Sequence, residues 1–215
     1  MKRKAASEPL PAATAPHFDF ELEAFAGGHR WVAGVDEVGR GPLAGPVGVA
    51  AVILDPDDLP FGVNDSKVLA EAERERLCEV IFAKALSVSI VFASVEEIDA
   101  FNIRGAALNA MARAIAGLSL RPDLALIDGR DSPDGLICKA RPIVGGDGLS
   151  MSIAAASIVA KTMRDALMRN LHRDYPDYGF AEHVGYATAG HRRALALSGP
   201  CPYHRRSFRL GPEED

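Results

Sequence analysis

Two short apolar runs near the start of the chain constrain its fold most. Residues 31–36 and 45–54 are rich in β-branched and small apolar side chains, which is typical of buried strands, and a glycine- and proline-rich loop joins them. Further strands are predicted over residues 87–95, 123–128 and 137–144. Apolar spacing predicts helices over residues 19–26, 70–86, 103–118, 150–172 and 187–197. A three-strand meander followed by helix–strand units indicates an α/β protein whose mixed central sheet is flanked by helices.

The 215 residues are enough for one well-packed core or for one core with a small appendage. The first part, residues 1–17, is predicted to be a disordered tail, and residues 18–210 a single domain that ends in a helical segment. No apolar run approaches the roughly 20 residues that cross a membrane. The three cysteines are far apart in the sequence, which suits reduced thiols. We therefore expect a cytoplasmic protein without a membrane segment.

The formal net charge of −5 hides an uneven distribution of charge. Between Lys161 and Arg209 the sequence has nine lysines and arginines but only four acidic residues. Clustered basic residues can bind a phosphate backbone even in a protein that is acidic overall. A solvated helical face is the alternative, and charge alone does not separate the two.

Acidic residues stand where two of the predicted strands end. Asp36 and Glu37 follow the first apolar run, Asp128 ends the run at 123–128, and Asp147 precedes the long helix. If the two strands are neighbours, four carboxylates converge, and like charges raise one another's pKa. Hard divalent cations such as Mg²⁺ and Mn²⁺ relieve this repulsion and accept oxygen ligands. The pattern therefore predicts a metal site.

Each acid alone also has a structural interpretation. An aspartate that ends a strand is often only a turn former, and Asp128-Gly129 is a turn dipeptide in any case. The acids gain weight only in combination with the motifs around them.

The chain resembles the type 2 ribonucleases H, the ribonuclease HII family. Its segment "DEVGRGPLAGPV" is similar to the family's "DEAGRGPLAGPV" element. The resemblance continues, in order, through "NDSKVL" (64–69), "LIDG" (126–129), "GGDGLSMSIAAASIVAKTMRD" (145–165), "YPDYGFAEHVGYAT" (175–188) and "HRRSF" (204–208). It implies an RNase H-like fold and a metal-dependent endonuclease that cuts the RNA strand of RNA–DNA hybrids. It also implies incision on the 5′ side of ribonucleotides embedded in duplex DNA.

The family's four acids fall on Asp36, Glu37, Asp128 and Asp147. The resemblance therefore implies two-metal-ion hydrolysis with Mn²⁺ or Mg²⁺, leaving 3′-hydroxyl and 5′-phosphate ends. Asp36 is expected to bridge the two ions. Successive strand residues face opposite ways, so Glu37 can share the site only if the strand has ended there or if its contact runs through water.

Substrate recognition is expected from the loop Gly39-Arg40-Gly41. Telling RNA from DNA requires contact with the 2′-hydroxyl, and backbone groups can reach it where no Cβ blocks the approach. In the family this loop works with a tyrosine that matches Tyr186. A ring on the sugar of the next nucleotide would favour one without a 2′-hydroxyl, so the pair would read an RNA-to-DNA junction.

Other residues complete the expected substrate surface. Lys67 is expected to bind phosphate or to stabilise the site. Arg205 and Arg206, with their neighbours in "HRRSF", either hold the duplex backbone or anchor the C-terminal segment. Val184 departs from the family, which usually has lysine before Gly-Tyr, so one positive contact is missing.

The expected partners are an RNA–DNA hybrid and ribonucleotide-containing duplex DNA, bound by a monomer. A DNA junction resolvase of the same fold is one alternative, but it has no 2′-hydroxyl to read. A non-catalytic hybrid-binding module is another, but it gains nothing from four repelling acids that face a phosphate. Type 3 enzymes usually carry an N-terminal domain, for which the thirty residues before Trp31 leave no room.

Overall fold

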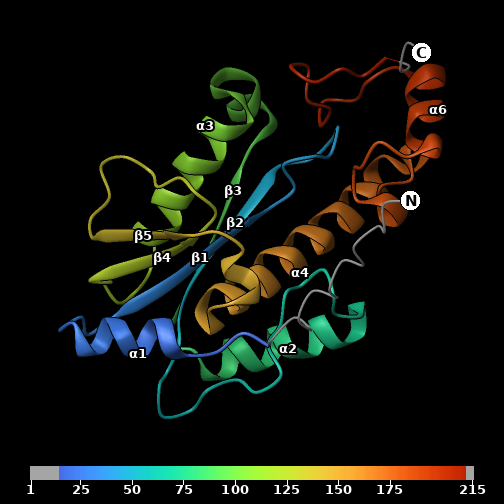
Figure 1. The fold of residues 1–215 in the computed structure, drawn as a ribbon. Helices are drawn as coiled ribbons and strands as arrows, with labels where there is room; N and C mark the ends of the chain where they lie inside the picture. Colours follow the sequence, from blue (N-terminus) through green and yellow to red (C-terminus); the bar gives the residue numbers. More distant parts are fainter. Residues whose placement is uncertain (1–14, 212–215) are drawn as a thin grey trace, which may run out of the picture.

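The protein, described by a computed structural model over residues 15–211, is built around a five-stranded sheet (Figure 1). The strands lie in the order β3-β2-β1-β4-β5. Their bounds are Val32–Val38 for β1, Val47–Ile53 for β2, Ser87–Ala93 for β3, Leu124–Asp128 for β4 and Lys139–Ile143 for β5. The first three strands form an antiparallel meander, whereas β4 and β5 run parallel to β1. The predicted mixed sheet is confirmed.

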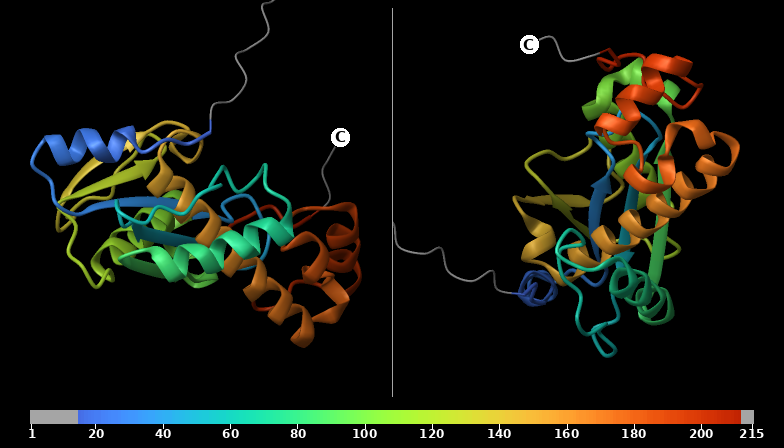
Figure 2. Two further views of the ribbon diagram at one scale, coloured as in Figure 1. Left: turned by 90° about the horizontal axis from the view of Figure 1, so that it is seen from below. Right: turned by 90° about the vertical axis from the view of Figure 1, so that its right-hand side faces the viewer.

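Helices cover both faces of this sheet. α3 (Val95–Ala116) packs on one face, and α4 (Met151–Asp174) packs on the other with α2 (Glu71–Lys84) beside it, as Figures 1 and 2 show. The remaining described helical elements are α1 (Asp19–Ala26), α5 (Phe180–His183), α6 (Ala189–Ser198) and the 3₁₀ turns Gly146–Gly148 and Pro176–Tyr178. The sheet is thus the middle of three layers.

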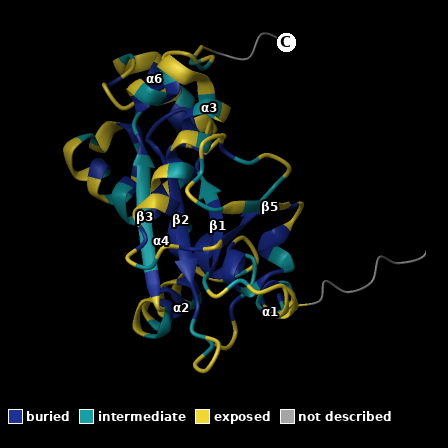
Figure 3. Cartoon of the chain, turned by 90° about the vertical axis from the view of Figure 1, so that its left-hand side faces the viewer, coloured by how far each residue is buried: buried dark blue, intermediate teal, exposed yellow. Residues whose placement is uncertain are grey.

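Strand β2, an interior strand of the sheet, is buried on both faces, which Figure 3 shows as a dark core between the helical layers. Val49 and Ala51 pack with α3, whereas Ala50 and Val52 pack with α2 and α4. Side chains along a strand alternate between the two faces. A strand that is covered on both sides therefore reads as a continuous apolar run, which is why residues 45–54 carry no charge.

The first turns of α4 lie unusually close to β1. A Cβ atom on Gly34 would lie only 2.0 Å from the carbonyl carbon of Ser152, so the helix backbone approaches the strand backbone there. The next turns of α4 are rich in small residues, and Ala154, Ala155 and Ala156 are fully buried. This close packing holds the start of α4 against the end of the sheet that carries the acids.

Helix α3 differs from its prediction, because it begins at Val95 rather than near residue 103. Ser94 caps this earlier start through a reciprocal capping box with Glu97. Asn102 then leaves helical geometry, with φ 56° and ψ 168°, and its side chain accepts from the N–H groups of Arg104 and Gly105. The kink interrupts the apolar stripe, so the periodicity revealed only the second segment.

The C-terminal segment forms a smaller core of its own beyond the far half of α4. Its buried apolar residues are Leu43, Ala44, Met168, Leu171, Tyr178, Phe180, Leu195 and Cys201. In Figure 1 this part, with α6, lies at the opposite end of the molecule from α1. Leu43 and Ala44 belong to the β1–β2 loop, so the small core joins that loop to the C-terminal segment.

Two expectations concern the ends of the chain and membranes. Most of the predicted tail, residues 1–14, lies outside the described residues, and His17 forms a β-bridge with Ser150. Within residues 15–211, no helix is long and apolar enough to span a lipid bilayer.

The approach of α4 to β1 generates a stability prediction. Gly34→Ala should lower the free energy of unfolding by about 3 kcal/mol, at the upper end of overpacking costs, because the nearest atoms belong to backbone that cannot rotate away. Gly190→Ala in α6 meets only the Thr188 hydroxyl at 3.9 Å and should be neutral or stabilising by up to about 1 kcal/mol. Urea unfolding measures both. Equal stabilities of the two variants would contradict the close packing.

Candidate active site

The predicted acids meet at one end of the sheet. β1 and β4 are parallel neighbours, and Asp36 and Asp128 each follow the last registered pair, Val35 and Ile127. Asp147 lies on the 3₁₀ turn between β5 and α4. The Gly146 N–H donates to Asp128 Oδ1 at 2.7 Å and holds this turn against the end of β4. The adjacency of the two strands, which the sequence left as a condition, is therefore met.

Glu37 faces away from Asp36. Strand β1 continues to Val38, so successive side chains at 36 and 37 point to opposite faces of the sheet. The Asp36 side chain interacts with Ser157 of α4, whereas Glu37 lines a hollow with Ala107 and Leu108 of α3. The condition that the strand end before Glu37 is not met, and the acid cluster spans the edge of the sheet.

Burial and mutual repulsion disfavour the charged forms of these acids. The pKa of Asp36 lies well above its ordinary value because the carboxyl is buried and because Glu37 and Asp128 are close. Burial also raises the pKa of Glu37, against the opposing effect of Arg40. The pKa of Asp128 is raised by burial and then by Asp147. In a folded protein without bound cations, the cluster is therefore electrostatically unfavourable.

Two side-chain cations partly neutralise the cluster. Lys67 Nζ lies 2.6 Å from Asp147 Oδ2, and Arg40 Nη1 lies 3.2 Å from Glu37 Oε1. Burial by itself would lower the pKa of Lys67, but the hydrogen bond to Asp147 and the nearby acidic charges raise it above its ordinary value. Lys67 thus remains a cation and partly neutralises Asp147, while its expected role in binding phosphate or stabilising the site stays a prediction.

The donor set suits a hard divalent cation, but its side chains are not yet grouped around one. Within residues 15–211, no three histidine, cysteine, aspartate or glutamate side chains form a ready-made ligand shell. Asp147 lies against Lys67 and Glu37 against Arg40. Carboxylate oxygens are the ligands that Mg²⁺ and Mn²⁺ accept. The donor set therefore fits such an ion, and Glu37, which points to the opposite face of the sheet from Asp36, could contribute only through water.

Two buried arginines hold the loop that follows β1. Arg205 donates to the carbonyl oxygens of Gly39 (2.6 Å), Arg40 (2.9 Å) and Gly45 (2.8 and 2.9 Å). Arg164 donates to Pro46 (2.9 Å), Ala44 (3.2 Å) and Val184 (3.0 Å). Both side chains are fully buried, and burial lowers the pKa of Arg205 to about 9 and that of Arg164 to about 10. Both guanidinium groups remain charged at neutral pH.

This clamp brings the glycine loop against Tyr186. Gly39 has φ +88°, and a Cβ there would lie 2.1 Å from Arg164 Nε, so only glycine fits beside the arginine. A Cβ on Gly41 would lie 3.6 Å from the Tyr186 ring. The N–H of Leu43 donates to the carbonyl of Gly185 at 2.8 Å. Residues 39–43 and residues 184–186 are far apart in sequence but thus form one surface. This surface begins two residues after Glu37 in the chain.

Comparison with known proteins identifies the family. The family model described as ribonuclease HII matches residues 33–210. A ribonuclease HII of Ruegeria pomeroyi is 56% identical over 196 residues, which cover 91% of this chain and 83% of that protein. One of Sinorhizobium fredii is 54% identical over 210 residues, covering 97% and 90%. The chain belongs to the ribonuclease HII family. It is therefore a ribonuclease H, a hydrolase of phosphodiester bonds that degrades the RNA of RNA–DNA hybrids.

Solved structures agree with the ribonuclease HII fold. The ribonuclease HII of Archaeoglobus fulgidus, solved in a complex with PCNA, superposes with a TM-score of 0.68 at 29% identity and covers 81% of this chain and 92% of its own. The ribonuclease H2 of Pyrococcus horikoshii has a TM-score of 0.71 at 24% identity, covering 84% and 95%, which shows the fold alone. The predicted RNase H-like fold is confirmed. Enzymes of this family use divalent metal ions.

One predicted substrate contact of this ribonuclease HII needs correction. Arg205 is fully buried and bonded to loop carbonyls, so it cannot face a duplex, and the anchoring role is the one that its position allows. Arg206 is exposed, and its N–H donates to Asp99 at 3.1 Å. The basic residues between Lys161 and Arg209 are also less available for binding a phosphate backbone than the sequence suggested. Arg164 is buried too, and Arg169 pairs with Glu71 and Glu75 of α2.

Two arginines near the acids were missed from the sequence. Arg104 and Arg130 line a cavity of about 120 Å³ together with Arg40, Glu37 and Asp128. Arg104 reaches it because the kink in α3 starts a new helical segment there, and no sequence pattern signalled that kink. Arg130 directly follows the turn dipeptide Asp128-Gly129, where the sequence pattern pointed only to the aspartate.

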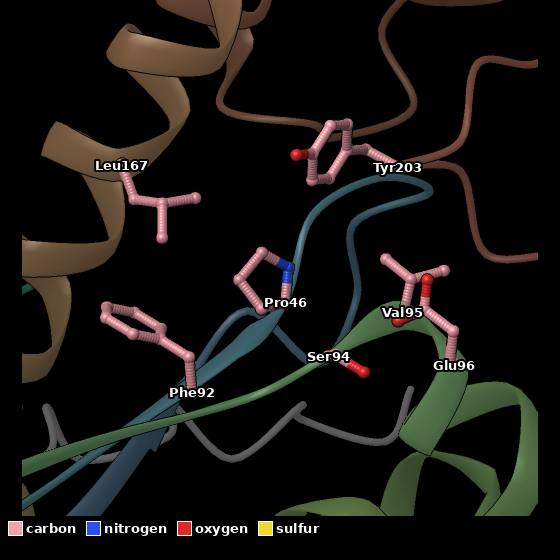
Figure 4. A pocket seen from close by; sticks show the side chains of 7 residues that line it. All are labelled: Pro46, Phe92, Ser94, Val95, Glu96, Leu167 and Tyr203. Atoms are coloured by element: carbon pink, nitrogen blue, oxygen red, sulfur yellow. The ribbon is translucent and has the colours of Figure 1, made fainter.

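Another pocket of the molecule is unrelated to this chemistry. Figure 4 shows an apolar pocket of about 200 Å³ that contains none of the four acids. Its lining residues are Pro46, Phe92, Ser94, Val95, Glu96, Leu167 and Tyr203. Glu96 supplies the only carboxyl group among these lining residues, so the pocket lacks the cluster of acidic ligands that metal-dependent hydrolysis of a phosphodiester would require.

The repulsion within the acid cluster leads to a prediction about Asp36. Asp36→Asn should abolish most cleavage yet raise the melting temperature of the protein in chelator by about 2–4 °C, since relieving roughly 1 kcal/mol of repulsion has that effect at this length. Asp134→Asn, a change of an exposed loop acid, should leave both properties unchanged. Calorimetry and a cleavage assay measure them. A less stable, fully active Asp36→Asn variant would refute the assignment.

The arginine clamp leads to a second prediction. Arg205→Ala should lower the free energy of unfolding by about 3 kcal/mol or more, because three loop carbonyls lose a charged donor in a buried place. Arg206→Ala, one residue away but exposed, should stay within about 0.5 kcal/mol of the parent. Chemical unfolding of both variants tests this. Similar losses from the two neighbours would rule out the clamp.

Proposed function

We propose that this ribonuclease HII incises duplex DNA on the 5′ side of an embedded ribonucleotide, in addition to degrading RNA in hybrids. The observation that carries the proposal is the contact between Gly41 and Tyr186, held by Arg164 and Arg205 at the end of the acid-bearing strand β1. A loop with glycine on both sides of Arg40, beside an exposed aromatic ring, suits a sugar with a 2′-hydroxyl followed by a sugar without one.

The loop's hydrogen bonding indicates which groups read the ribose. Arg205 occupies the carbonyls of Gly39 and Arg40. The N–H groups of Arg40 and Gly41 have no partner among residues 15–211, and both residues are exposed. A 2′-hydroxyl both donates and accepts, so these N–H groups can donate to its oxygen and thereby distinguish RNA from DNA. Arg40 itself keeps its side chain on Glu37, clear of the ribose.

Tyr186 is the proposed sensor of the deoxyribose. The residue is 43% exposed, and its ring lies beside Gly41, where a Cβ would be 3.6 Å from the ring. A ring in contact with the following sugar has no space for a 2′-hydroxyl between them. The pair would therefore favour a ribonucleotide on one side of the contact and a deoxyribonucleotide on the other, which is an RNA-to-DNA junction.

Asp36, Glu37, Asp128 and Asp147 are the proposed ligands of the divalent ions. Divalent ions held by these carboxylates would supply Lewis-acid chemistry, lowering the pKa of an attacking water and stabilising charge on the leaving 3′ oxygen. Hydrolysis of this kind leaves 3′-hydroxyl and 5′-phosphate ends. Lys67 and Arg40 hold two of the acids until the ions bind. Arg130 and Arg104, which also pairs with Asp131 at 2.9 Å, line the same cavity as Glu37 and are suited to a neighbouring substrate phosphate. The monomeric state and the cytoplasmic location stay predictions.

Cleavage of a duplex with a single ribonucleotide tests the proposed function. With Mg²⁺ or Mn²⁺, the cut should fall on the 5′ side of the ribonucleotide, and neither an all-DNA duplex nor a reaction in chelator should be cut. Tyr186→Ala should lose about ten- to a hundredfold of this activity, on the scale of an aromatic stacking contact. Tyr186→Phe keeps the ring and should lose less.

The strand should be labelled at its 5′ end and its products mapped on a sequencing gel beside a ladder. A uniform RNA–DNA hybrid provides the comparison, and its cleavage should fall less in Tyr186→Ala because many ribose contacts remain. A cut on the 3′ side, or equal cutting of the all-DNA duplex, would disprove junction reading.

A further inference from the structure

Tyr186 combines an exposed ring with a fully bonded backbone. Its N–H donates to the carbonyl of His183 at 2.9 Å, and its own carbonyl accepts from Thr188 N at 2.8 Å. The same carbonyl lies 2.9 Å from Nδ1 of His191. Exposed loop residues usually keep some of these groups for water. The position of the Tyr186 ring is therefore held from behind, by groups that a substrate would not touch.

The residue behind Tyr186 belongs to a buried histidine pair. His191 and His204 are 0% and 1% exposed, and their Nε2 atoms lie 2.9 Å apart. At the other end of the pair, Nδ1 of His204 accepts from the Cys201 N–H at 3.0 Å and lies 3.1 Å from the Cys201 thiol sulfur. Tyr178 packs against the His204 ring, with centroids 4.9 Å apart. A continuous chain of hydrogen bonds thus runs from Cys201 to Tyr186.

The two ends of this chain determine where its protons lie. A backbone N–H can only donate, so Nδ1 of His204 must accept from Cys201, and the proton of a neutral His204 is on Nε2. A carbonyl oxygen can only accept, so Nδ1 of His191 must carry a proton and donate it to Tyr186. His204 Nε2–H then donates to His191 Nε2. Both ends require the same single arrangement.

Both histidines must be neutral for this arrangement to exist. A second proton on either ring would place two N–H groups face to face within the chain. Burial, followed by the charge of the neighbouring histidine, lowers the pKa of His204 to about 4, and burial also lowers that of His191. The pair therefore stays neutral, and its hydrogen bonds stay directed towards Tyr186, over the physiological range.

Packing alone does not call for this chain. The pair lies among aromatic rings, including Phe180 at 5.6 Å from His191 and 5.7 Å from His204. Apolar side chains of similar size would fill the same space without loss of hydration at four ring nitrogens. The imidazoles add a directed hydrogen bond, because their single possible arrangement of protons places the His191 Nδ1–H against the Tyr186 carbonyl.

We propose that His191, oriented by His204, is a positioning residue that holds Tyr186 against Gly41 and so sets the preference for an RNA-to-DNA junction over a uniform hybrid. This inference rests on the proposed function, in which Tyr186 reads the junction. Without the His191 donor, the Tyr186 carbonyl keeps only the bond from Thr188, so the peptide group that follows Tyr186 is held less firmly. The ring then no longer meets the following sugar at a defined place.

Variants of His191 test where the donor must be. The readout is the rate of cutting a single-ribonucleotide duplex divided by the rate on a uniform RNA–DNA hybrid. His191→Leu should lower this ratio by about tenfold, because misplacement of a positioning contact by about 1 Å has effects of this size or larger. Asparagine carries an amide nitrogen near the place of Nδ1, whereas glutamine carries it near Nε2. His191→Asn should therefore keep most of the ratio, and His191→Gln should lose it.

A double-mutant cycle with Tyr186 tests whether His191 acts through it. In a Tyr186→Ala background, His191→Leu should change the ratio by less than about twofold, since the residue it positions is gone. Tyr178→Phe is the matched control, because it removes a hydrogen bond of 2.7 Å to Gly199 from the same cluster but keeps the ring against His204 and every hydrogen bond of the histidine chain. It should lower the melting temperature and leave the ratio unchanged.

Each remaining outcome decides against the inference. Equal losses on both substrates in His191→Leu would mean that the chain serves stability alone. If His191→Leu does not fold, a ratio that is the same for His191→Asn and His191→Gln overturns the proposal. A ratio that falls in Tyr186→Ala but not in the His191 variants overturns this inference alone. A ratio unaffected by Tyr186→Ala overturns junction reading itself, and the inference with it.

Discussion

The binding of loop carbonyls by Arg164 and Arg205 is the interaction on which the rest of the site depends. Residues 39–46 leave the sheet as a turn with few backbone partners of their own, and the guanidinium groups supply donors for five of its carbonyls. A buried charge is stable only where such partners satisfy it. The loop and the arginines therefore depend on each other, and Arg164 extends the same bonding to Val184.

This clamp gives the small C-terminal core a function in the geometry of the site. Arg164 comes from α4 and Arg205 from the segment after α6, yet both converge on the loop that follows β1. The clamp bonds the carbonyl of Val184, two residues before Tyr186, and His191 lies against the carbonyl of Tyr186 itself. In the proposed function, substrate recognition is built from backbone groups and one ring whose positions are determined by buried polar contacts.

The acid cluster follows a different principle, since it is unfavourable in the protein alone. Burial and like charge raise the pKa values of Asp36, Glu37 and Asp128, and this is only partly offset by the charges of Lys67 and Arg40 and by hydrogen bonds from Ser157 and the Gly146 N–H. The folded protein tolerates this repulsion because hydrophobic packing of α4 on β1 determines where the strand ends lie, without any contribution from the acids. A bound cation would relieve this repulsion, so the free energy that the repulsion costs in the protein alone would favour cation binding.

The sequence by itself predicted the sheet and singled out the acids that the fold brings to one end of it. The apolar runs within 31–36 and 45–54 are typical of buried strands, and Asp36, Asp128 and the 145–165 segment matched a family whose membership the comparisons show. Tertiary structure alone decided the rest. Sequence could not tell whether Arg205 faces substrate or loop, because burial depends on which carbonyls lack partners. Likewise, only the kink at Asn102 shows that Arg104 lies near the acids. Only the chain of hydrogen bonds, between segments that meet after folding, draws attention to His191.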